Sequence, residues 1–69
     1  MQYAYIIAWA GSNYSAHVPD LPGCISTGAT LEDIRRNIEE AIEFHLEGMR
    51  EIGEPIPEPA THVGYADVA

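Results

Sequence analysis

The chain has 69 residues, of which 11 are Asp or Glu, three are Arg and none is Lys, so its formal net charge is −8 at pH 7. A chain of this length forms one small domain with a limited core. The acidic balance excludes a surface for phosphate backbones, so we expect no direct nucleic-acid binding. The negative charge has two interpretations. It attracts a basic protein partner, or it only keeps a small protein soluble.

Cys24 is the single cysteine, which rules out a disulfide within the chain and fits a reducing compartment. The N-terminus has no signal-peptide pattern, and no apolar run approaches the ~18 residues of a membrane span. We therefore expect a soluble cytoplasmic protein that does not attach to membranes. Small domains without disulfides or metals often gain stability by self-association, so we also expect a homo-oligomer, a dimer or higher.

The N-terminal half predicts three strands. Residues Tyr3–Trp9 are aromatic, β-branched or small, and a turn at 10–13 leads to a second strand over Tyr14–Val18. A third short strand covers Cys24–Ala29. One face of the first strand carries Tyr3, Tyr5, Ile7 and Trp9. Because a single helix covers only one side of a sheet, we expect part of this row to need a second chain.

The most distinctive segment is Pro19–Cys24, which links the second and third predicted strands. Its two prolines fix φ near −65°, Gly23 permits backbone angles closed to other residues, and Asp20 is suited to bonding its neighbouring backbone. This pattern predicts a rigid turn with a defined surface.

One long amphipathic helix is predicted from the N-cap Thr30 to Gly53, where a C-terminal glycine is expected. Glu32 and Asp33 complement the positive end of its dipole. Its apolar stripe comprises Leu31, Ile34, Ile38, Ala41, Ile42, His45, Leu46, Met49 and Ile52. The opposite face carries Arg36, Glu39, Glu40, Glu43, Glu47 and Glu51.

Beyond the helix, alternate prolines over 54–59 predict an extended, semi-rigid strap. Alternation over Thr61–Val68 predicts a fourth strand. The predicted fold is therefore α+β, in the order β-β-β-α-β, with an antiparallel sheet and one long helix packed on one face. We expect a single domain over residues 1–69.

Catalytic and metal sites find no support in the residue pattern. His17, His45 and His62 lack metal-ligand spacing with one another or with Cys24. A reactive Cys24 thiolate would need a basic neighbour, and none is local. His45 falls within the apolar stripe, where a packed, hydrogen-bonded histidine is the commoner case. We predict no catalytic residues, no metal and no cofactor.

Four segments in this order make the chain resemble the HicB family of type II toxin–antitoxin systems, in particular its short single-domain members. They are residues 14–24 (YSAHVPDLPGC), 28–33 (GATLED), 37–42 (NIEEAI) and 53–57 (GEPIP). Any one of them is a weak signal, whereas the ordered combination is specific and covers nearly the whole chain.

The resemblance implies a truncated RNase H-like fold without its nuclease site, because the first strand contains no acidic residue to hold Mg²⁺. It also implies a non-catalytic antitoxin that binds and masks a HicA-like toxin, a small basic RNase. Family members often carry a C-terminal helix-turn-helix or ribbon-helix-helix domain. This sequence leaves no room for one after its last predicted strand, so we expect no C-terminal DNA-binding domain. The expected contact residues are Asp20, Leu21, Pro22, Glu39, Glu43 and Glu47.

Two alternatives remain. The chain could be a stand-alone oligomeric domain with a regulatory or small-molecule-binding role whose toxin partner has been lost. A less favoured hypothesis is a hydrolase that uses Cys24, His17 or Asp20.

Overall fold

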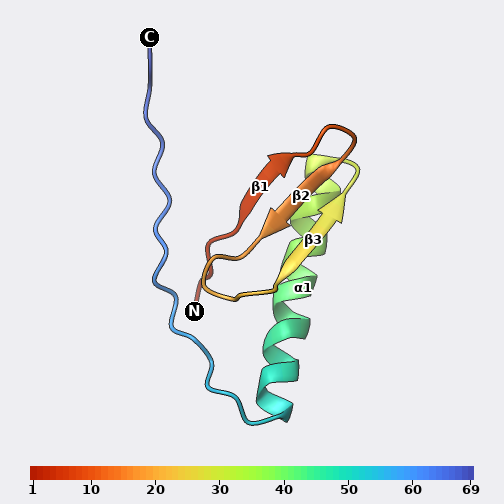
Figure 1. The fold of residues 1–69 in the computed structure, drawn as a ribbon, viewed down its shortest axis with the longest axis vertical. Helices are drawn as coiled ribbons and strands as arrows, with labels where there is room; N and C mark the ends of the chain where they lie inside the picture. The colour runs from red at the N-terminus through yellow and green to blue at the C-terminus, as the bar shows by residue number, and fades with distance from the viewer.

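A three-stranded antiparallel sheet and one long helix form the fold. The computed structural model describes residues 1–69 and contains β1 (Ile6–Trp9), β2 (Tyr14–His17), β3 (Ile25–Gly28) and α1 (Leu31–Glu51). The strands pair in the order β1-β2-β3, and α1 covers one face of the sheet (Figure 1). The α+β class and the strand-strand-strand-helix order are confirmed. No helix is both long and apolar enough to span a bilayer.

The strand register decides which side chains face α1. Ile7 pairs with Ala16, and Ala16 pairs with Ser26, so these three residues share one face. Ala16 is buried in the core and Ile7 packs against it, which identifies this face as the helix side. Ile6, His17 and Ile25 form the neighbouring row on the open face, and all three are exposed.

The aromatic row of the first predicted strand therefore lies on the helix side. Tyr3, Tyr5 and Ile7 pack against the core of their own chain, so the expectation that this row needs a second chain is wrong for them. Trp9 extends past the helix and remains mostly exposed, with its ring edge-on to Tyr14 at 5.0 Å between centroids. The open face instead presents the row of Ile6, His17 and Ile25.

The core is small, as expected for a chain of this length. It consists of Ala16, Val18, Leu21, Cys24, Ile34 and Ile38. Leu21 from the loop and Ile34 and Ile38 from α1 are completely buried. The loop therefore contributes to the core as fully as the strands do.

Both ends of α1 have the predicted caps. The Thr30 hydroxyl accepts a hydrogen bond from the Asp33 amide at 3.0 Å. At the other end, Gly53 adopts φ +74°, and the Gly53 and Glu54 amides donate to Arg50 and Met49 carbonyls at 3.2 and 2.9 Å. This pair of bonds is a Schellman motif, which ends the helix where the sequence predicts.

The predicted fourth strand over Thr61–Val68 is wrong for the single chain. Residues 55–69 belong to no helix or strand and make no backbone–backbone hydrogen bond. The chain leaves α1, runs back along the molecule and continues past β1 as an extended segment (Figure 1). Tyr3 holds the strap near its middle, where its hydroxyl donates to the Pro57 carbonyl. The alternation correctly indicated extended backbone, but no strand of the same chain pairs with it.

Candidate functional site

The Pro19–Cys24 segment is a rigid turn, as predicted. The Val18 amide donates to the Cys24 carbonyl at 3.1 Å, and the Cys24 amide donates to the Leu21 carbonyl at 3.0 Å. Gly23 adopts φ +85°, which a residue with a side chain rarely tolerates. These bonds turn Leu21 and Cys24 into the core and leave Pro22 exposed.

Asp20 fastens the C-terminal segment, residues 60–69, to this turn. Its carboxylate accepts three hydrogen bonds at 3.0 Å, from the amides of Ala60 and Thr61 and from the Thr61 hydroxyl. The bonds from the Ala60 and Thr61 amides hold the pKa of Asp20 below its usual range, because they favour the charged carboxylate. Sequence reasoning assigned Asp20 to the local turn and to partner contact, and it missed this clamp across 40 residues.

The clamp predicts an acid-induced release of the C-terminal segment. An aspartate in an unfolded chain titrates near ~3.9, and Asp20 in the fold titrates lower. Its stabilising effect is therefore complete above about pH 4 and is lost as the pH falls through the folded pKa. NMR should show the Ala60 and Thr61 amide resonances moving to unstructured positions in that acidic range, and already at neutral pH in Asp20→Ala. Asp67→Ala is the control and should leave both resonances in place.

The acidic face of α1 carries three glutamates one helical turn apart, Glu39, Glu43 and Glu47, here called the acidic ridge. All three are exposed. The only ion pair in the chain is Arg36–Asp33 at 2.9 Å, so the ridge has no cationic partner. Glu39 accepts a hydrogen bond from the Tyr5 hydroxyl at 2.9 Å; burial and this bond raise the pKa of Tyr5. The ridge therefore concentrates negative charge that the fold leaves uncompensated.

A second surface is an apolar groove between the turn and the C-terminal half of α1. It encloses about 580 Å³, and its walls include Pro22, Phe44, Met49, Ile52 and Pro57. The Phe44 side chain is 80% exposed and the Ile52 side chain 70% exposed. His45 lines the groove as well and is half-buried. Large exposed apolar side chains beside a concave surface are typical of an interaction site.

The six residues predicted to contact a partner do not form one site. Glu39 and Glu43 line a hollow beside the C-terminal segment, whereas Pro22 lies in the apolar groove. Leu21 is fully buried in the core, at the floor of the same groove, and its contact with a partner stays a prediction. The sequence signal for the groove was present in Phe44, an aromatic residue on the polar side of the predicted helix.

The residues of the hydrolase hypothesis do not converge. Cys24 is buried, and burial raises the pKa of its thiol, which disfavours the nucleophilic thiolate. His17 lies exposed on the open face of the sheet, and Asp20 bonds the C-terminal segment. No three His, Cys, Asp or Glu side chains form a group able to hold a metal ion.

These features define a small α+β domain whose prominent surfaces are suited to binding other proteins. Residues 3–67 match the family model of the HicB-like antitoxin of bacterial toxin–antitoxin systems, and the chain belongs to this family. The predicted resemblance is thereby confirmed.

Relatives and solved structures agree with this assignment. The chain is 38% identical over 58 residues to a UPF0150 protein of Thermoplasma acidophilum, covering 83% of this chain and 84% of that protein. It is 46% identical over 57 residues to a 14.9 kDa protein of Haemophilus phage HP1, covering 83% of this chain but 43% of the phage protein. A chain of the solved HicA3 and HicB3 toxin–antitoxin complex superimposes with a TM-score of 0.76 and 33% identity, covering 87% of this chain and 70% of that chain.

Proposed function

We propose that this protein is a non-catalytic antitoxin that binds and masks a small basic toxin of the HicA type. The observation that carries the proposal is the acidic ridge, whose three glutamates have no cationic partner within the chain. A structural relative was solved as a toxin–antitoxin complex, which supports a toxin as the missing partner.

The mechanism would be electrostatic and steric. A basic RNase binds RNA through cationic side chains that pair with phosphates. The ridge offers carboxylates at one-turn intervals along a rigid helix, so it can pair with the same cations and occupy the RNA-binding surface. No bond is made or broken, which agrees with the buried Cys24 and with the dispersed histidines.

Co-expression with a small basic protein of the HicA type tests the proposal. The two proteins should purify together in low salt, and their dissociation constant should rise steeply with ionic strength, because salt screens exposed charge pairs. Failure to form a complex with any small basic partner would remove the antitoxin assignment. A complex insensitive to salt would remove the role given to the ridge.

A further inference from the structure

A trench separates β1 from the C-terminal segment of the same chain. Two adjoining hollows of about 660 and 470 Å³ share Tyr5 and Val63 and together form it. One wall comprises residues 1–7, the other comprises residues 61–65, and α1 supplies Arg35, Glu39 and Ile42.

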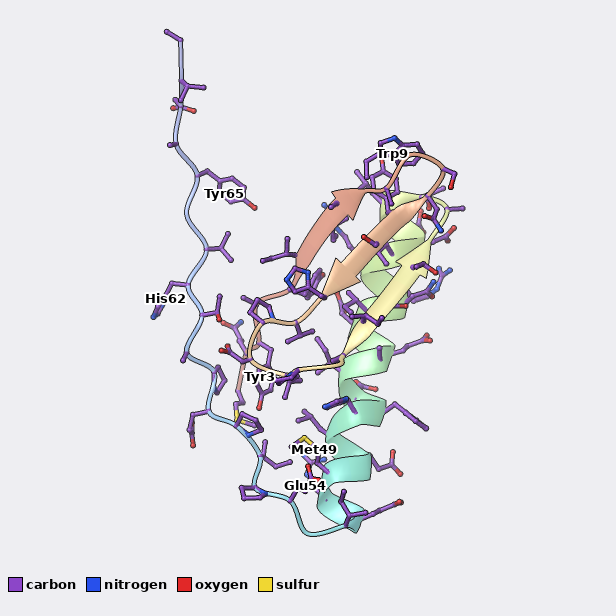
Figure 2. All side chains as sticks on the ribbon, in the orientation of Figure 1. Tyr3, Trp9, Met49, Glu54, His62 and Tyr65 are labelled. Carbon is purple, nitrogen blue, oxygen red and sulfur yellow. The ribbon has the colours of Figure 1, made fainter.

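Both walls have the chemistry of unpaired strands. β1 pairs only with β2, so its outer edge is free. The C-terminal segment makes no backbone–backbone hydrogen bond, and its side chains alternate: in Figure 2 Tyr65 points toward the β1 side and His62 points away. The Tyr65 side chain is 96% exposed and that of Val63 is 56% exposed. Exposed edges and extended apolar segments of this kind pair readily with another strand.

Asp20 anchors the C-terminal segment at its base, beside the turn. The clamp fixes Ala60 and Thr61, and Thr61 lines the far wall of the trench. The prolines at 55, 57 and 59 stiffen the strap that leads to this point. The base of the segment is therefore anchored, and no strand of the single chain pairs with the outer edge of β1.

We propose that two copies of this chain exchange their C-terminal segments, so that residues 62–68 of each copy enter the trench of the other and add to its β1 edge. The C-terminal segment runs in the same direction as β1 (Figure 1). The C-terminal segment of a second copy, related by a two-fold axis, would lie between β1 and the C-terminal segment of the first copy. It would run antiparallel to both of them. The result is one continuous antiparallel sheet with four strands from each copy.

The chemistry of the trench fits this occupant. The entering segment is mostly apolar and carries one charged residue, Asp67. Arg35 is the single Arg or Lys side chain that lines the trench, and it has no ion pair in its own chain. Glu39 and Glu43 of the acidic ridge line the same hollow, so an entering segment with a single acidic residue adds little negative charge beside them. The family match extends to residue 67, so the segment belongs to the family unit. This inference does not depend on the toxin.

Deletion of residues 62–69 provides the first test, because it leaves the Asp20 clamp intact. Sedimentation equilibrium should show a dimer for the full chain and a monomer for the shortened chain. Ile25→Ser, on the open face of the sheet, is the matched control and should remain dimeric. A full chain that stays monomeric at every concentration, or a dimer that survives the deletion, would overturn the proposal.

Cysteine cross-linking distinguishes pairing of the C-terminal segment with β1 of the other copy from pairing with β1 of its own chain. In a Cys24→Ala background, Ile6→Cys on β1 is combined with Val63→Cys, Tyr65→Cys or Asp67→Cys in turn. At least one pair should oxidise to a covalent dimer, including when the two cysteines are on separate chains that are mixed. Cross-linked monomer alone would show that the segment closes on its own β1. Protection of residues 62–68 from hydrogen exchange only after a basic partner is added would assign the trench to that partner.

Discussion

Replacing Glu39, Glu43 and Glu47 together by glutamine is expected to weaken binding of the basic toxin about 10- to 100-fold while the fold remains intact. An exposed ion pair contributes about 0.2–1 kcal/mol, so three of them contribute up to about 3 kcal/mol. The ridge residues are exposed and unpaired within the chain, so their neutralisation removes no stabilising ion pair. It also relieves repulsion between like charges one turn apart, worth about 0.2–0.5 kcal/mol per pair.

The matched control neutralises three exposed glutamates off the ridge, Glu40, Glu54 and Glu58. Both variants have the same net charge, so any difference in affinity reports position and not total charge. Isothermal titration calorimetry gives the affinities, and urea unfolding gives the stabilities. Equal loss of binding in the two variants would mean that overall charge, not the ridge, attracts the toxin.

Gly28→Ala is expected to cost about 1–3 kcal/mol of folding free energy, as overpacking against a fixed neighbour does. Gly28 ends β3 where α1 crosses the sheet. A Cβ atom at this position would lie 2.7 Å from the Ile34 amide nitrogen and 2.9 Å from its Cα. Both are backbone atoms of the helix, so relief requires α1 to move away and loosens the packing of Ile34 and Ile38.

Gly48→Ala is the matched control, because a Cβ there has no neighbour within 4 Å. Gly48 lies inside α1, where alanine is favoured over glycine by about 1 kcal/mol. The same substitution should therefore destabilise the protein at position 28 and stabilise it at position 48. Urea midpoints that move in the same direction for both variants would contradict the close packing of α1 on β3.

The elements that local physics determines were predictable from the sequence. Thr30, the acidic first turn and Gly53 fix both ends of α1, and the apolar period of the helix identifies Ile34 and Ile38 as core residues. The turn at Pro19–Cys24 is likewise local, because its prolines and Gly23 restrict the backbone directly.

What the sequence did not reveal depends on contacts between distant residues. The Asp20 clamp joins residues 40 positions apart, and nothing near Asp20 distinguishes it from an ordinary turn aspartate. The burial of Leu21 follows from the turn folding inward over α1. The pattern over Thr61–Val68 indicated extended backbone, whereas pairing requires a free edge within reach, and the clamp sets where the segment lies.

The central claim is that this chain silences a toxin by occupying its RNA-binding surface. The most direct measurement is RNA cleavage by a small basic toxin of the HicA type, titrated with this chain at fixed RNA. We predict that cleavage falls to zero at a fixed molar ratio, and that the ridge variant shifts the titration to higher concentration while its off-ridge control does not. Full cleavage in the presence of a saturating excess of this chain would contradict the account.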